Sequence, residues 1–127
     1  MTPADFRRLA LSFPSVEENA HMGHPDFRVG GKIFATLAYP DARFGTVMVS
    51  PQDQDLLIRD HPKAFIPVSG AWGHAGSTSV LLRLAPRRAV AAALEAAWRR
   101  RAPKKLAEQV MIDRGSQSKR FRRSPGE

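Results

Sequence analysis

Apolar residues recur at helical spacing near the start of the chain. A threonine, a proline and an aspartate at positions 2, 3 and 5 form a typical helix start, with an N-cap, a proline in the first turn and an acid behind it. The apolar residues that follow are Phe6, Leu9, Ala10 and Phe13. We therefore expect a first helix that ends near Pro14. Residues 15–18 have the pattern of a capping box, which predicts a short helical turn.

The period changes to two from Asp26 onward, which indicates β-strands. Residues 26–29 and 32–37 flank a pair of glycines, and such a link favours the tight turn of a β-hairpin. Further strands are expected at 44–49 and 78–84. A second helix is predicted from position 50 to just before Pro62, because its opening residues repeat the N-cap, proline and acid of the first helix. The glycine-punctuated residues 63–76 predict a loop.

A long helix is predicted over residues 86–101. Its apolar positions form a single stripe: Ala89, Val90, Ala93, Leu94, Ala97 and Trp98. Pro103 interrupts the pattern, and residues 104–112 can form one more short helix. Residues 113–127 have almost nothing to bury, so we expect a basic, disordered C-terminal tail. The prediction is one α+β domain, residues 1–112, with at least four strands.

Charge is distributed very unevenly along the 127 residues. Residues 1–85 contain eight basic and eight acidic side chains, whereas residues 86–127 contain twelve basic and four acidic ones. Such a basic block favours a polyanionic partner, nucleic acid or an anionic surface, although a solvated face with a solubilising tail has the same composition. The absence of cysteine excludes thiol catalysis and disulfides. No apolar run has the length of a membrane span or the features of a signal peptide, so we expect a soluble, cytoplasmic protein without membrane contact.

Several short motifs form a joint pattern along the chain. They are Glu17-Glu18, His24-Pro25-Asp26-Phe27-Arg28-Val29, Gly31-Lys32-Ile33-Phe34-Ala35-Thr36-Leu37, Phe65-Ile66-Pro67-Val68, Gly70-Ala71-Trp72-Gly73, Gly76, Thr78, Ala97-Trp98 and Ala102-Pro103-Lys104. The pattern resembles the MmcQ/YjbR family and covers about residues 2–107. The resemblance implies a CyaY-like fold, often described as double-wing, with an antiparallel β-sheet and helices packed on one face. It also implies DNA as a partner and no established catalytic residues.

Charge and resemblance together predict a non-enzymatic protein that binds nucleic acid, most simply DNA, weakly and largely without sequence preference. The candidate contact residues are Arg87, Arg88, Arg99, Arg100, Arg101, Lys104, Lys105, Lys119, Arg120, Phe121, Arg122 and Arg123. Arg99, Arg100 and Arg101 lie in the last turn of the predicted long helix, where cations complement the helix dipole. Helix stability alone therefore explains the presence of these three arginines. No nucleophile elbow, phosphate-binding glycine loop or dinucleotide fingerprint is present, and no cofactor is expected.

The alternative prediction is a protein-interaction or small-ligand module. Its candidate residues are His24, Arg28, Lys32 and Trp72. Trp72 stands among glycines, where an aromatic side chain can flank a ligand, but such a residue more often packs as a hydrophobic plug. Arg28 and Lys32 can present cations to a ligand or protect a sheet edge. His21, His24 and Asp26 have ligand-like spacing, yet no fourth ligand lies nearby in the sequence, so local hydrogen bonding is favoured over a metal site.

Overall fold

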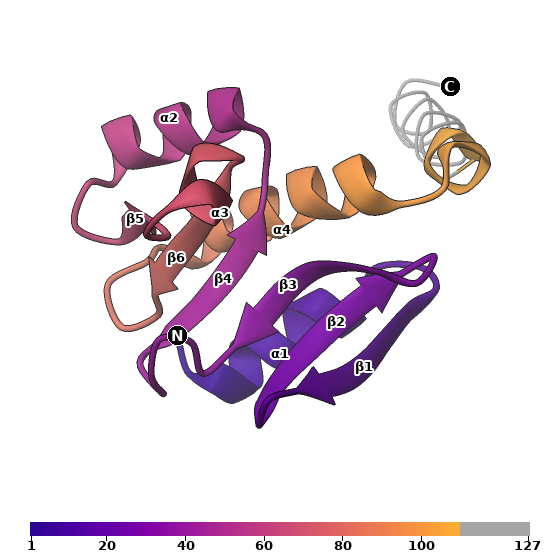
Figure 1. Ribbon diagram of the computed structural model, residues 1–127, viewed down its shortest axis with the longest axis horizontal. Helices are drawn as coiled ribbons and strands as arrows, with labels where there is room; N and C mark the ends of the chain where they lie inside the picture. Colours follow the sequence, from indigo (N-terminus) through magenta and orange to yellow (C-terminus); the bar gives the residue numbers. More distant parts are fainter. Residues whose placement is uncertain (110–127) are drawn as a thin grey trace, which may run out of the picture.

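The computed structural model describes residues 1–109, which form an α+β fold around one sheet (Figure 1). Its elements are α1 (Pro3–Leu11), β1 (Val16–His21), β2 (His24–Val29), β3 (Lys32–Leu37), β4 (Phe44–Met48), α2 (Pro51–Asp60), β5 (Phe65–Pro67), α3 (Ala71–His74), β6 (Ser77–Leu81) and α4 (Arg87–Arg101). Residues 104–109 are also helical. The expected tail, residues 113–127, and the end of the last predicted helix lie outside the described residues.

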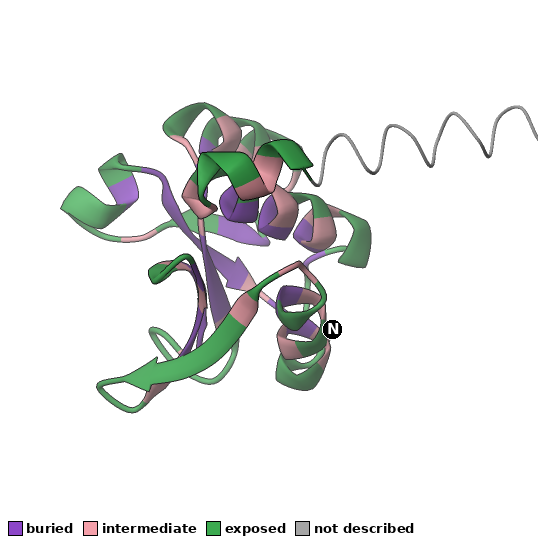
Figure 2. Ribbon diagram, turned by 90° about the vertical axis from the view of Figure 1, so that its right-hand side faces the viewer, coloured by how far each residue is buried: buried purple, intermediate pink, exposed green. Residues whose placement is uncertain are grey.

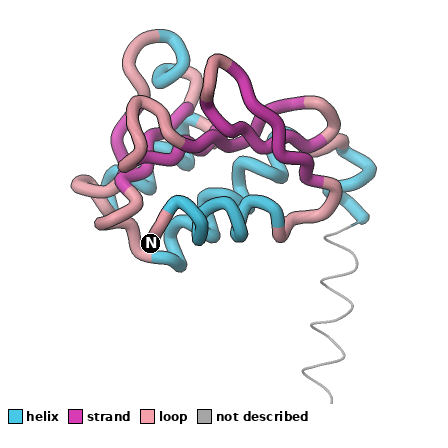
Figure 3. Tube along the Cα trace, turned by 90° about the horizontal axis from the view of Figure 1, so that it is seen from below, coloured by secondary structure: helices cyan, strands magenta, loops and turns pink. Residues whose placement is uncertain are grey.

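Six strands form a single antiparallel sheet in the order β1-β2-β3-β4-β6-β5. Helices α1 and α4 lie against one face of this sheet, whereas the short helix α3 stands at the margin of the other face (Figure 3). The predicted α+β fold, with an antiparallel sheet of at least four strands and helices on one face, is therefore confirmed. The face opposite α1 and α4 is called the open face below.

The hydrophobic core lies between the sheet and helices α1 and α4. Figure 2 shows buried positions along the strands and on parts of the helices. Phe27 and Phe34 from the sheet, Phe6 from α1 and Trp98 from α4 are all buried. The Trp98 ring stacks on Phe13 with the ring centroids 6.2 Å apart, and its indole N–H donates to the carbonyl oxygen of Pro14 at 3.0 Å. Trp98 therefore fixes α4 to the end of α1.

The helix starts predicted from the sequence are present. The Thr2 hydroxyl accepts a hydrogen bond from the main-chain N–H of Asp5, whose carboxylate in turn accepts from the N–H of Thr2. The Ser50 hydroxyl caps α2 in the same way by accepting from Asp53. Both caps satisfy N–H groups that have no partner inside the helix, which is why these helices begin where the sequence indicates.

The helical turn predicted over residues 15–18 is wrong. Val16 to His21 form β1, which pairs along its whole length with β2. Glu17 and Glu18 therefore point to opposite sides of the sheet, and Glu18 accepts a hydrogen bond from Arg7 of α1 at 2.9 Å. The hydrogen bonds of a complete strand ladder outweigh a local capping pattern.

The region predicted as a loop, residues 63–76, contains two regular elements. Residues 65–67 form the edge strand β5, paired with β6, and residues 71–74 form α3. The predicted strand 78–84 is shorter, because β6 ends at Leu81 and a turn follows. Among residues 1–109, no helix is long and apolar enough to cross a membrane.

Candidate functional sites

Basic side chains gather where α4 ends. The group, called the basic end below, consists of Lys32, Arg99, Arg100, Arg101, Lys104 and Lys105. The turn between β2 and β3 reaches this end of the molecule (Figure 1). Gly30 in that turn lies against the ring of Pro103, so closely that a Cβ on Gly30 would be 2.8 Å from two ring carbons. This contact brings the hairpin turn beside the cations that end α4 and follow it.

Lys32 belongs to the basic end because of its strand register. It pairs with Val29 across the hairpin, and directly opposite residues of an antiparallel pair point to the same face. Val29 is buried in the core between the sheet and the helices. Lys32 therefore lies on the helix-covered side of the sheet, and its side chain is exposed. Arg28 pairs with Ile33 and faces the open side instead. The structure thus separates Lys32 from Arg28, and neither lies on an edge strand, because β2 and β3 are interior.

The cations of the basic end differ in how strongly they are already engaged. A guanidinium N–H of Arg100 donates to the carbonyl oxygen of Val49 at 3.1 Å, and the guanidinium of Arg99 lies 3.8 Å from the carboxylate of Glu95. Within residues 1–109, no ion pair involves Lys32, Lys104 or Lys105, and all three are exposed. These three ammonium groups are available to an anion.

One pair of predicted contact residues stands apart from the basic end. Arg87 and Arg88 are exposed at the opposite end of α4. A helix rises 1.5 Å per residue, so Arg87 and Arg101 are about 20 Å apart along the axis. The structure therefore does not bring these two arginines together with the later cations. The remaining predicted contacts lie outside the described residues: Lys119, Arg120, Phe121, Arg122 and Arg123.

The open face of the sheet carries a row of polar residues. Strand register places Asp26 beside Thr36, Thr36 beside Thr46, and Thr46 beside Ser79. All four are buried, although no long helix covers this face. The hydroxyl of Thr46 is the unusual member, because it is buried without a hydrogen-bond partner among the described residues. A buried polar atom without a partner is costly, so it requires an explanation.

Two adjoining hollows, together called the sheet groove, lie along this row. The first has a volume of about 220 Å³ and is lined by Thr36, Tyr39, Thr46, Met48, Val68, Trp72 and Ser77. The second, of about 190 Å³, is lined by Tyr39, Pro40, Phe44, Ile66, Pro67, Val68, Ser69 and Ser79. Tyr39 and Val68 line both hollows. None of the lining residues is charged, which distinguishes the groove from the basic end.

Trp72 is exposed at the rim of the groove, so the expected hydrophobic plug is wrong. The side chain of Trp72 is 68% exposed. Helix α3, which carries Trp72, is held in place by the buried Gln54 of α2. The side-chain amide of Gln54 donates to the carbonyl oxygens of Gly73 and Ser77 at 3.0 and 3.1 Å. A Cβ on Gly73 would also collide with the main chain of Val68. The tryptophan is thus exposed on a well-supported backbone.

Of the other members of the predicted ligand site, His24 and Arg28 lie beside the groove without lining it, whereas Lys32 lies at the basic end. His24 is in edge-to-face contact with Tyr39, with ring centroids 5.8 Å apart. Arg28 forms a bidentate ion pair with Asp26 and donates to its two carboxylate oxygens at 2.8 and 3.1 Å. Sequence reasoning identified Trp72 but missed Tyr39, Thr36 and Thr46. The threonines could have been found as polar positions among apolar ones in the predicted strands.

Asp26 is the centre of a compact ionic cluster. His21 contacts one of its carboxylate oxygens at 2.8 Å, and Arg28 holds both. Hydrogen bonds from Arg28 lower the pKa of Asp26, and the contact with His21 acts in the same direction against the opposing effect of burial. Both carboxylate oxygens of Asp26 are thus engaged by His21 and Arg28, whereas the buried Nδ1 of His24 has no hydrogen-bond partner among the described residues. Among residues 1–109, no group of three or more potential ligands could hold a metal ion.

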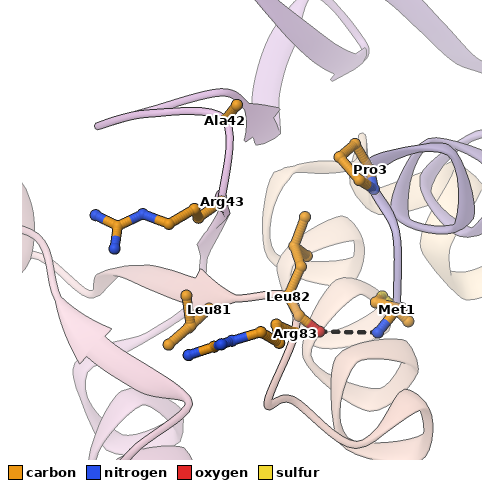
Figure 4. Close-up of a pocket in the computed structure, with 7 residues that line it drawn as sticks. All are labelled: Met1, Pro3, Ala42, Arg43, Leu81, Leu82 and Arg83. Carbon is orange, nitrogen blue, oxygen red and sulfur yellow. Dashed lines mark hydrogen bonds between the residues drawn. The ribbon is translucent and has the colours of Figure 1, made fainter.

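A further cavity of about 340 Å³ lies near the N-terminus, beside Arg43 and Arg83 (Figure 4). Two of its cationic groups are already engaged. The amino group of Met1 donates to the carbonyl oxygen of Leu82 at 2.9 Å. The guanidinium of Arg43 donates to both carboxylate oxygens of Asp41, which lowers the pKa of that acid to about 2. This cavity therefore offers an anion less than the basic end does.

Comparison with known proteins agrees with the architecture. The fold defines a small α+β protein with a six-stranded antiparallel sheet and helices on one face. The YjbR family model matches residues 11–100, and the chain belongs to this family. The crystal structure of Deinococcus radiodurans protein DR2400, with a DUF419 domain, is similar in fold: its TM-score is 0.65 at 18% identity, over 77% of this chain and 76% of that one. No curated protein matches the sequence.

Proposed function

We propose that the protein binds nucleic acid, most simply DNA, through the phosphate backbone and largely without sequence preference, and that it does so without catalysing a reaction. The observation that carries this proposal is the basic end, where six cations from two separate parts of the chain lie at one end of the molecule. Lysine and arginine side chains that neutralise phosphates release counterions and supply sequence-independent affinity. The expectation drawn from the family resemblance points the same way.

The placement of the cations supports this proposal beyond their number. Arg99, Arg100 and Arg101 complement the negative end of the α4 dipole, so their presence has a structural reason. Lys104 and Lys105 lie beyond the end of α4, and Lys32 lies on another element altogether. Helix stability does not explain these three lysines. A field of one sign on one end of the molecule would attract and orient a polyanion.

The test compares two double variants that remove the same charge from opposite ends of α4. Fluorescence anisotropy with labelled duplex and single-stranded DNA at about 50 mM salt gives the affinity of each variant. The Lys104→Ala/Lys105→Ala variant is expected to bind several-fold more weakly than the wild type, whereas Arg87→Ala/Arg88→Ala is expected to bind almost as the wild type does. Equal losses in the two variants would indicate a general effect of net charge, and would overturn the assignment to the basic end.

The contribution of residues 114–127 requires a separate variant. Deleting them removes five basic side chains, of which four lie between positions 119 and 123. If these contact phosphates, the slope of log K against log salt is expected to become shallower by up to about four units. An unchanged slope after the deletion would mean that residues 114–127 make no phosphate contacts and that the basic end alone binds DNA.

A further inference from the structure

The sheet groove has the features of a binding site for an uncharged molecule. We propose that it binds a planar, uncharged heteroaromatic ring of the nucleobase type, seated over Thr46 and flanked by Tyr39 and Trp72. This site is separate from the basic end, which would bind phosphate.

The first observation is the hydroxyl of Thr46. Thr46 is 97% buried, lines the first hollow, and its hydroxyl has no hydrogen-bond partner among the described residues. A hydroxyl can both donate and accept one or more hydrogen bonds. A ring nitrogen or exocyclic oxygen of a ligand seated in the hollow would satisfy this group and remove its desolvation cost. Thr36 on the neighbouring strand lines the same hollow and offers a second hydroxyl.

The second observation is the pair of aromatic residues at the rim. Tyr39 is 47% exposed and Trp72 is 68% exposed, and both line the first hollow. Exposed aromatic side chains stack on any nucleobase, because every base has a π-face. The supports are already in place before a ligand binds, since Gln54 holds α3 and the main-chain N–H of Ala38 donates to the carbonyl oxygen of Phe44 at the base of the Tyr39 loop. Such preorganisation lowers the entropic cost of binding.

The size and charge of the groove define the class of ligand. No charged residue lines either hollow, so the groove has no group that would pair with a phosphate or a carboxylate. The first hollow, of about 220 Å³, is large enough for a one- or two-ring heterocycle, and the second hollow adjoins it for a substituent. Hydrogen-bonding groups at the floor and aromatic side chains at the rim match a ring that is polar at its edge and apolar on its faces.

Two sources could supply such a ring, a free nucleoside or an unstacked base of a nucleic acid strand. The first arm of the test titrates adenosine, guanosine, cytidine and uridine into the full-length protein, by calorimetry and by tryptophan fluorescence, with ribose as the ringless control. The second arm uses short single-stranded oligonucleotides, each paired with a version that carries an abasic position. Binding of a nucleoside identifies a free ligand, and binding that is confined to the strand and weakened by the abasic position identifies a nucleic acid base.

Two variants connect binding to the groove. Thr46→Val keeps the side-chain shape and removes the hydroxyl, and is expected to weaken binding about tenfold, while Trp72→Ala is expected to weaken it at least as much. Ser12→Ala, which removes a hydroxyl at the end of α1, and Leu84→Ala, which shortens an exposed apolar side chain, are controls expected to bind as the wild type does. Saturable binding by neither source, or equal binding by the Thr46→Val and wild-type proteins, would overturn the proposal.

The outcome does not depend on the proposed function of the basic end. An uncharged nucleoside has no phosphate to neutralise, so its affinity is expected to be insensitive to salt and unchanged in the Lys104→Ala/Lys105→Ala variant. Loss of nucleoside binding in that lysine variant would contradict the proposal that the sheet groove and the basic end are separate binding sites.

Discussion

The main chain at Gly30 packs directly against the ring of Pro103, and this contact joins the β2–β3 turn to the segment that follows α4. Gly30 has a positive φ of +58°, a conformation that is strained for other residues. The neighbouring Gly31 has a φ of +78° but no atom within 4 Å of the position its Cβ would occupy. The two glycines therefore separate the cost of backbone strain from the cost of the contact.

Gly30→Ala is expected to lower the free energy of unfolding by more than Gly31→Ala does. Backbone strain costs about 1–3 kcal/mol at either position. At Gly30 the new Cβ would also push Pro103 away, because it would come within 2.8 Å of the ring. Urea denaturation of both variants measures the difference. Equal losses would show that the contact between the hairpin turn and Pro103 adds nothing to stability.

The two tryptophans are expected to respond oppositely to truncation. Trp98 is 2% exposed in the core, so Trp98→Ala should cost about 3–5 kcal/mol through lost burial and a cavity. Trp72 is 68% exposed, so Trp72→Ala should change stability by less than about 0.5 kcal/mol. Chemical denaturation of both variants checks this pair. A large loss for Trp72→Ala would mean that this side chain has a packing role after all.

Thr46→Val is expected to stabilise the free protein by about 1 kcal/mol, because it replaces an unpaired buried hydroxyl with a methyl group of the same shape. Thr78→Val is the matched control. Thr78 is also buried, but its hydroxyl donates to the carbonyl oxygen of Gly76 at 2.9 Å, so its replacement should destabilise by about 1–3 kcal/mol. Thermal melts at one pH compare the two variants. A destabilised Thr46→Val protein would mean that its hydroxyl has a partner in solution.

The Asp26 cluster predicts a loss of stability in acid. The pKa of the Asp26 carboxyl group is lowered in the folded protein from its ordinary value of 3.8, chiefly by hydrogen bonds from Arg28. The stabilisation is therefore present above pH 4 and is lost as the pH falls through the lowered pKa, where the folded protein must take up a proton. Asp26→Asn cannot titrate, so its stability should fall less as the pH is lowered below about 4. Urea melts at several pH values measure this, and parallel profiles for the two proteins would contradict the assignment.

The pattern of the sequence predicted much of the fold because the informative signals were local. The caps at Thr2 and Ser50 and the glycine pair of the hairpin each act within a few residues, and all three are present in the structure. The region around Glu17 was mispredicted because its local signal was a capping box, whereas its structure is decided by pairing with β2. Strand pairing depends on residues distant in sequence, which periodicity over a short window does not detect.

The candidate sites were predicted only in part, for a related reason. The cations after residue 98 were visible from composition, but the approach of Lys32 depends on the contact between Gly30 and Pro103. Trp72 was expected to be buried because an aromatic residue among glycines usually packs. In the structure Trp72 is exposed, and the helix that carries it, α3, is held by Gln54 of α2, which lies 19 residues before Gly73 in the chain and so outside any local sequence pattern.

The salt dependence of DNA binding tests the central proposal most directly. If the basic end neutralises phosphates, log K for duplex DNA should fall linearly with log salt, with a slope of about −0.9 for each phosphate neutralised. Lys104→Ala/Lys105→Ala should make this slope shallower by up to about two units, and Arg87→Ala/Arg88→Ala should leave it unchanged. Absence of binding by the wild-type protein, at tens of micromolar and about 50 mM salt, would contradict the proposal, because non-specific binding is stronger at low salt than at high salt.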